Sequence, residues 1–127
     1  MFDVNPDTVC FLIDKAKEFQ GKEEVVLPDV PDSPSEDWGL QALADHVGDL
    51  TYQEFKSTFD NLEPDQQQNV VALFWVGRGD FDKSEWEQAF DEARENWTEN
   101  TAEYLLAHPL LADYLSEGLE LFDYRCD

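Results

Sequence analysis

The sequence predicts an all-α fold, a compact bundle of five or six helices with one Pro-rich acidic connection. Two observations carry this prediction. Apolar residues recur at the spacing of a helix, and no alternating apolar and polar run of useful length indicates a strand. In addition, Pro6, Pro64 and Pro109 stand where helices can begin, because the first helical position needs no backbone N–H. The chain, residues 1–127, is predicted to form a single helical domain.

The first expected helix begins at Pro6, with Asn5 at the cap position before it. Gly21 is expected to end it. The apolar residues at helical spacing between them are Val9, Leu12, Ile13, Ala16 and Phe19.

A loop is expected over about residues 21–37, followed by a short helix from Trp38 to Gly48. Prolines at every third position favour an extended, polyproline-like path through solvent for the loop. These prolines are Pro28, Pro31 and Pro34.

Two helices are expected in the middle of the chain. Thr51 and Glu54 have the spacing of a capping box, which opens the first of them. Pro64 begins the second, and its uncharged run over residues 70–77 predicts the most buried helix of the fold, with Gly77 as its end.

Ser84 and Glu87 have the spacing of another capping box, and one long helix is expected from Ser84 to about Ala107. Pro109 then starts a last helix with a wide apolar face. The charged face of the long helix consists of Glu85, Asp91, Glu92, Glu95, Glu99 and Glu103.

The charge of the chain limits its partners. It has 30 Asp and Glu residues against 8 Lys and Arg, a formal net charge of −22. The acidic residues are spread along the whole sequence, which indicates an acidic shell around a folded body. Direct binding to nucleic acid or to an anionic membrane is not expected, because affinity for phosphate groups comes from Lys and Arg. Adaptation to a salty cytosol is an alternative reason for the same charge.

A cytoplasmic location is expected. The N-terminal sequence MFDVNPDTVCFL lacks the positive region and the A-x-A site of a secretory signal, and no apolar run approaches the ~20 residues that span a bilayer. Cys10 lies in an apolar segment and Cys126 is next to last, and neither belongs to a CxxC motif. The prediction is therefore a core cysteine and a free tail cysteine, rather than a disulfide or a metal site.

Residues 80–91 raise the question of a calcium loop between two helices. If Asp80 is the first residue of an EF-hand loop, oxygen-bearing side chains fall at its third, fifth, ninth and last positions. However, Glu85 stands where the loop needs Gly, and the last position has Asp in place of a bidentate Glu. The capping box explains the same acidic residues, so no metal site is favoured and a degenerate calcium site is the weaker alternative. Its ligands would be Asp80, Asp82, Ser84, Gln88 and Asp91.

The sequence offers no catalytic constellation. Nucleophilic catalysis needs a Ser or Cys beside a base, and neither His46 nor His108 stands in a recognisable motif. No Gly-rich loop precedes a helix. Enzyme activity is therefore not the expectation, and no cofactor is expected.

Three segments carry a family resemblance: NPDTVCFLIDKAKEF, FWVGRGD and AEYLLAHPLLADYLSEGLELF. They resemble a family of small, mostly alphaproteobacterial proteins classed as a domain of unknown function. The likeness covers most of the chain except the Pro-rich connection. It implies a cytosolic bacterial protein without an established activity, cofactor or catalytic residue, so it supplies no site residues.

The leading functional hypothesis is a non-catalytic acidic helical protein-interaction module, whose partner is basic or makes aromatic contacts. The candidate contact residues are Arg78, Trp86, Trp97 and Tyr104, because interfaces favour such side chains. One alternative is an acidic decoy that mimics the charge of DNA and occupies a nucleic-acid-binding protein. The other is the degenerate calcium binder at residues 80–91. A monomer is favoured over a homodimer, since two bodies of −22 repel each other at low salt.

Overall fold

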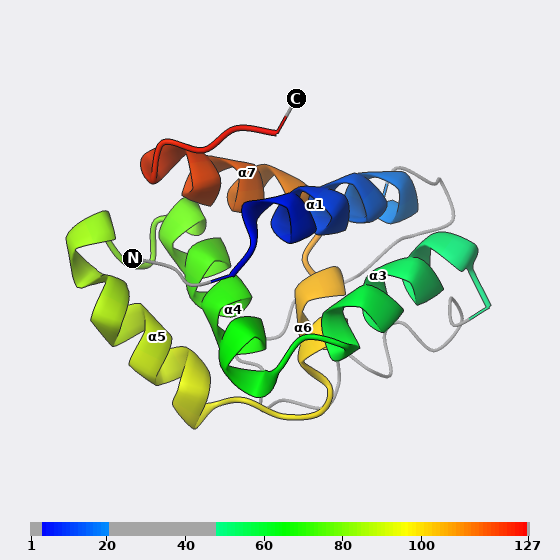
Figure 1. The fold of residues 1–127 in the computed structure, drawn as a ribbon, viewed down its shortest axis with the longest axis horizontal. Coiled ribbons are helices and arrows are strands. Elements are labelled where there is room, and N and C mark those ends of the chain that lie inside the picture. The colour runs from blue at the N-terminus through cyan, green and yellow to red at the C-terminus, as the bar shows by residue number, and fades with distance from the viewer. Residues whose placement is uncertain (1–3, 21–47, 127) are drawn as a thin grey trace.

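The computed structural model describes residues 4–20 and 48–126, and this part of the chain is built of helices (Figure 1). No strand occurs in these two ranges, so the predicted all-α fold is confirmed. The expected loop over residues 21–37, the start of the expected helix at Trp38, and His46 lie outside them. The elements are α1 (Pro6–Gln20), α3 (Leu50–Asp60), α4 (Pro64–Arg78), the 3₁₀ turn η2 (Lys83–Glu85), α5 (Trp86–Glu95), α6 (Thr101–Leu106) and α7 (Leu111–Leu121).

Helix α4 is the central element, as its uncharged run predicts. Every residue from Gln67 to Gly77 is buried. Helices α5 and α7 both pack against α4, with α5 at one edge of the molecule and α7 across the C-terminal end of α4 (Figure 1). A helix covered on several sides needs apolar residues around its whole circumference, which explains why this segment has no clear amphipathic period.

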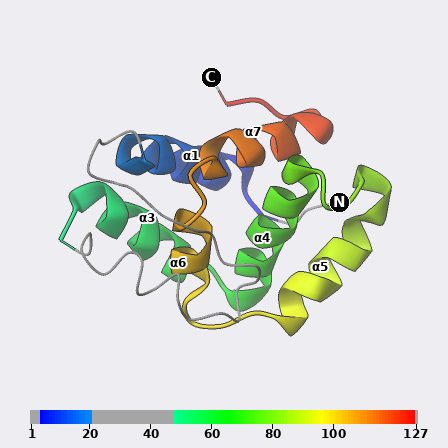
Figure 2. The ribbon, with the colours of Figure 1, turned by 180° about the vertical axis from the view of Figure 1, so that it is seen from behind.

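Helix α1 joins the two sides of the bundle. It packs against both α3 and α7, and it lies beside α7 in both views (Figures 1 and 2). Helix α6 packs against α3. The largest fully buried side chains are Phe19, Phe55, Phe59, Phe74, Tyr104, Leu12, Ile13, Leu73, Leu105, Leu106 and Leu111.

The contact between α4 and α7 depends on two glycines that face each other. A Cβ atom placed on Gly77 would overlap the backbone carbonyl oxygen of Tyr114. A Cβ atom on Gly118 would lie 2.5 Å from the carbonyl oxygen of Leu73. The two backbones therefore approach more closely than any residue with a side chain would permit.

The start of α1 is predicted correctly, and the start of α3 is not. The backbone N–H of Asp7 donates to Oδ1 of Asn5 at 2.9 Å, as expected for an Asn cap. At α3, the cap is Asp49 rather than Thr51, because Oδ1 of Asp49 accepts from the backbone N–H of Thr51 at 2.8 Å. The Thr51 hydroxyl donates to the same oxygen at 2.5 Å, so it supports the cap and does not form it.

Helix α4 begins at Pro64 as predicted, but it does not end at Gly77. The helix continues through Arg78, and Gly79 ends it in the left-handed conformation with φ of 96°. The N–H of Gly79 donates to the carbonyl of Val76, and the N–H of Asp80 donates to that of Trp75 at 3.0 Å, which is a Schellman-type end.

The predicted capping box at Ser84 is also wrong. A side-chain oxygen of Glu85 accepts from the backbone N–H of Asp82 at 2.8 Å. This bond closes the turn η2, and α5 begins only at Trp86.

The long helix expected from Ser84 to about Ala107 is two helices. Helix α5 ends at Glu95, and α6 begins at Thr101. In the connection, the Thr101 hydroxyl donates to the carbonyl of Thr98 at 2.6 Å, so a local side-chain bond competes with the helical one. The last helix starts at Leu111, two residues after Pro109.

The two cysteines form a disulfide, which corrects the prediction of free thiols. Cys10 of α1 is bonded to Cys126 in the C-terminal tail, with a Cα–Cα distance of 5.6 Å. The sequence separation is 116 residues, and a pairing over that distance leaves no spacing signal in the sequence. The fold brings the two residues together because the tail returns over α7 toward α1 (Figure 1).

Candidate functional site

Arg78 is held at the C-terminal end of α4. Its Nε donates to Oδ2 of Asp80 at 2.7 Å, and its guanidinium carbon lies 4.8 Å from the centre of the Phe74 ring. The positive charge of Arg78 also acts on the Tyr104 hydroxyl, where it lowers the pKa against the larger effect of burial. Arg78 therefore connects the surface to the aromatic core, and its charge is already paired.

Tyr104 lies in the core beside Arg78. Only 1% of it is exposed, and its hydroxyl accepts a hydrogen bond from Nε1 of Trp75 at 2.9 Å. Burial raises the pKa of this hydroxyl, against the smaller opposing effects of Trp75 and Arg78. His108 packs edge-on against the Tyr104 ring with 4.8 Å between centroids, and its Nδ1 donates to the Tyr104 carbonyl at 2.8 Å.

The two tryptophans of the predicted contact set lie near opposite ends of α5. Trp86 is buried and packs edge-on against Phe122, with 5.4 Å between ring centroids. Trp97 follows the end of α5, and its Nε1 donates to Oε1 of Gln67 at 2.7 Å. The structure thus brings Arg78 and Tyr104 together, while Trp86 and Trp97 fix the two ends of α5 on the bundle.

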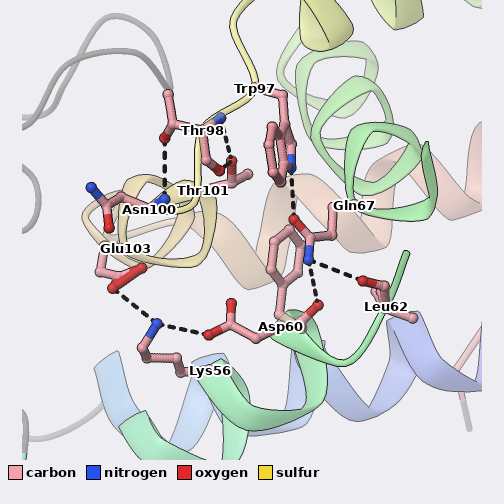
Figure 3. Close-up of polar contacts among 10 residues, drawn as sticks. Lys56, Asp60, Leu62, Gln67, Trp97, Thr98, Asn100, Thr101 and Glu103 are labelled. Atoms are coloured by element: carbon pink, nitrogen blue, oxygen red, sulfur yellow. Dashed lines mark hydrogen bonds and ion pairs between the residues drawn. The ribbon is translucent and has the colours of Figure 1, made fainter. Parts of the chain in front are cut away.

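Gln67 is a structural residue that sequence reasoning missed. Its Nε2 donates to the carbonyls of Phe59 and Leu62, both at 3.1 Å, while its Oε1 accepts from Trp97 (Figure 3). One side chain therefore ties the α3–α4 connection to the α5–α6 connection. Gln67 stands in a run of three glutamines, and nothing in that run distinguishes the member that makes these bonds.

A partly buried ion cluster joins α3 to α6 (Figure 3). Nζ of Lys56 lies 2.7 Å from Oδ2 of Asp60 and 3.2 Å from Oε2 of Glu103. Burial lowers the pKa of Lys56, but Asp60 and Glu103 outweigh it, so the net pKa of Lys56 is raised. The lysine is therefore a permanent cation at physiological pH.

Glu103 is the most unusual acid in the described part of the chain. It is 2% exposed, and its Oε1 has no hydrogen-bond partner among residues 4–20 and 48–126. The predicted long helix would place Glu103 on the charged outer face. The break before α6 turns it inward instead, where Lys56 offsets the penalty of burying its charge.

Two of the five candidate calcium ligands are held in ion pairs, and the backbone of a third is engaged in a turn. Asp80 pairs with Arg78, the backbone N–H of Asp82 is bonded to Glu85, and Asp91 pairs with Arg94 at 2.8 Å. Within residues 4–20 and 48–126, no group of three or more His, Cys, Asp or Glu residues is placed to hold a metal ion.

The outer side of α5 carries four exposed carboxylates, which we call the acidic face, and one of them pairs with the exposed Arg94 of the same helix. The helix packs its apolar side on α4 and lies at the edge of the molecule (Figures 1 and 2). The buried residues on that apolar side are Trp86, Ala89 and Ala93. The exposed residues of the acidic face are Glu87, Asp91, Glu92 and Glu95.

A family model described as "Protein of unknown function (DUF3775)" matches residues 52–124, which is more than half of the chain. The chain belongs to this family. No curated protein matches the chain, and no solved structure does.

The DUF3775 match covers most of α3 and the whole of α4 to α7. It therefore includes Lys56, Glu103 and the acidic face of α5. It does not include α1, Cys10 or Cys126. Among the helices that the structure describes, none has the length and apolar character needed to cross a bilayer.

Proposed function

We propose that this DUF3775 protein is a non-catalytic interaction module that docks a protein with a basic surface onto the acidic face of α5. The observation that supports the proposal is that α5 is an amphipathic helix at the edge of the fold. Its apolar side is fixed in the core by Trp86, while its outer side presents exposed carboxylates to solvent.

The electrostatics of the whole chain support the same site. Within the described ranges, five basic residues form ion pairs with acidic side chains: Lys15, Lys56, Arg78, Arg94 and Arg125. The 8 basic residues of the chain cannot neutralise its 30 acidic ones, so a large surplus of negative charge is left. Complementary charge accelerates association and selects a basic partner over an acidic one.

The rigid attachment of α5 gives the acidic face a defined shape. Trp86 packs on Phe122 at one end, and Trp97 bonds Gln67 just beyond the other. A fixed row of carboxylates loses little conformational freedom when a partner binds, which favours affinity.

A charge-neutralised variant tests the site. It carries Glu87→Gln, Asp91→Asn, Glu92→Gln and Glu95→Gln, and the probe is a peptide rich in Lys and Arg. The matched control removes four exposed carboxylates elsewhere, through Asp14→Asn, Asp65→Asn, Asp113→Asn and Glu117→Gln. Calorimetry at low salt should show about tenfold weaker binding for the first variant and a much smaller loss for the control. Equal losses in both would mean that binding follows net charge alone, and would refute a site on α5.

The acidic decoy is a second candidate with a narrower partner class. It predicts that nucleic-acid-binding proteins bind more tightly than other basic proteins of equal net charge. The same calorimetric assay with both classes distinguishes it from the general docking module.

A further inference from the structure

We propose that the Cys10–Cys126 disulfide is a reversible thiol–disulfide exchange site, which a dithiol reductant attacks at Cys126 to release the C-terminal tail from α1. The bond joins the first described helix to the end of the chain. Both cysteines lie outside residues 52–124, so the exchange site is not part of the region that the DUF3775 family model matches.

The two cysteines differ in their surroundings. Cys10 is half-buried and packs against the hydrophobic core. Cys126 is exposed and lines a groove of about 510 Å³ between α1 and α7. Because exchange requires an incoming thiolate to reach one sulfur, the groove directs the attack to Cys126.

The groove is balanced in charge within a very acidic chain. Lys17 and Arg125 line it together with Cys126, and so do Asp14 and Glu120. Positive charge beside a cysteine stabilises the thiolate, which is both the product of reduction and the nucleophile of re-oxidation. These cations also offset the repulsion that a net charge of −22 imposes on an anionic thiolate reagent.

The tail has weak anchors apart from the disulfide at its end. The backbone N–H of Tyr124 donates to the carbonyl of Leu119 at 2.9 Å, which closes the end of α7. Beyond Tyr124, the ion pair of Arg125 with Glu120 spans 3.7 Å between exposed side chains. Reduction therefore releases Cys126 from α1 and opens the side of the groove that residues 125 and 126 form.

The reaction balances with a dithiol as the reductant. One thiolate of the reductant attacks Sγ of Cys126, a mixed disulfide forms, and Cys10 leaves as a thiolate that takes up a proton. The second thiolate of the reductant then attacks its own sulfur in the mixed disulfide and releases the thiolate of Cys126. The protein gains two electrons and two protons, and the reductant is oxidised to a disulfide.

The first test maps the site of attack on the folded full-length chain. The oxidised protein is incubated with glutathione while excess iodoacetamide captures the freed cysteine, and peptides are then analysed by mass spectrometry. The proposal expects glutathione on Cys126 and the alkyl group on Cys10. The reverse distribution, or an equal one, would overturn it.

The second test measures the rate of reduction by dithiothreitol without denaturant, with circular dichroism as the check that the helices persist. The rate should rise in proportion to dithiothreitol concentration. A rate that is independent of reductant would mean that the bond opens only after unfolding, which would refute the proposal.

Charge variants make the second test specific. The double variant Lys17→Gln and Arg125→Gln should be reduced about two- to fivefold more slowly. The control Arg94→Gln removes an exposed cation on α5 and should leave the rate unchanged. If the double variant and Arg94→Gln slowed the reduction equally, the cations of the groove would have no specific role in the exchange.

Discussion

At the scale of single residues, Glu103 departs most from the expectation that charged side chains are exposed. Its carboxylate lies in the interior, supported by Lys56 from α3. Local sequence cannot reveal this, because AEYLL reads as an ordinary amphipathic turn and Lys56 is 47 residues earlier in the chain. The same holds for Gln67, whose bond to Trp97 joins residues separated by 30 positions. Residues of this kind become visible only when the long-range packing is known.

The glycine pair between α4 and α7 leads to a first prediction. Gly77→Ala should lower the free energy of unfolding by roughly 3 kcal/mol, because the new methyl group meets the Tyr114 backbone, which cannot rotate away. Without this clash, alanine would stabilise the helix by about 1 kcal/mol relative to glycine. Any decrease in the free energy of unfolding therefore comes from the contact between α4 and α7. Gly48→Ala is the control, since no described residue lies within 4 Å of its added Cβ. Urea denaturation measures both, and a neutral Gly77→Ala would contradict the close approach.

The buried tyrosines lead to a second prediction, about alkaline pH. Burial raises the pKa of Tyr52, with a further contribution from Glu103, and burial also raises the pKa of Tyr104. A raised folded-state pKa means that the folded protein holds its proton longer than the unfolded chain. The associated stability is therefore complete below about pH 10 and is lost as pH rises through the folded-state values.

Thermal melts from neutral to strongly alkaline pH test this dependence. Tyr104→Phe keeps the ring and removes the titrating hydroxyl, so its loss of stability with pH should be smaller than that of the wild type. Its stability at neutral pH should also be lower, because the indole N–H of Trp75 loses its acceptor. An unchanged alkaline slope would show that Tyr104 does not contribute to it.

At the scale of secondary-structure elements, Pro6 and Pro64 marked helix starts correctly, whereas the capping-box spacings at Thr51 and Ser84 did not. Pro6 and Pro64 begin their helices as expected, because proline at the first helical position acts through its own ring. The end of α4 was misplaced because Gly77 and Gly79 are both plausible stops. Packing decides between them: Gly77 is needed for close contact with α7, and Gly79 supplies the positive φ.

The break between α5 and α6 shows the limit of periodicity. The apolar stripe continues through the connection, so the sequence reads as one helix. The bond from Thr101 to Thr98, with Trp97 anchored on Gln67, redirects the chain and moves Glu103 from the expected outer face into the interior. The acidic face could be predicted as a charged face, whereas its confinement to α5 could not.

A third prediction distinguishes the two candidate caps of α3. Asp49→Ala should lower the free energy of unfolding by about 1 kcal/mol, since it removes the acceptor for the N–H groups of Thr51 and Tyr52. Thr51→Ala should have an effect of less than about 0.5 kcal/mol, because alanine gains in helix propensity what the lost hydroxyl bond contributed. Denaturant titration of both variants shows which substitution lowers the free energy of unfolding more. A larger loss for Thr51→Ala would contradict Asp49 as the cap and support the capping box of Thr51 and Glu54.

At the scale of the whole molecule, the surplus of negative charge is the dominant physical property. Eight basic residues cannot neutralise 30 acidic ones. Several of the ion pairs, such as Arg94 with Asp91, lie on the surface, where each contributes little to stability. Self-repulsion therefore acts against the compact state, and it equally opposes the association of two copies at low salt. The expectation of a monomer stays a prediction, which light scattering at low and high salt can test.

The final prediction follows from this repulsion: added sodium chloride should stabilise the fold. Raising the salt concentration from ~0.05 to ~0.5 M brings the screening length well below ~10 Å. This weakens the repulsion among exposed carboxylates more than it weakens the attraction between Lys56 and Glu103, because that pair is partly buried. The thermal midpoint should rise by about 5 °C over this range. The variant with a neutralised acidic face should melt higher at low salt and respond less to salt, because part of the repulsion is already gone. A thermal midpoint of the wild type that falls with salt would contradict this prediction, because it would mean that attraction within ion pairs outweighs the repulsion among surplus carboxylates. The carboxylates of the acidic face would then be held by ion pairs of the protein itself instead of being free to meet a basic partner.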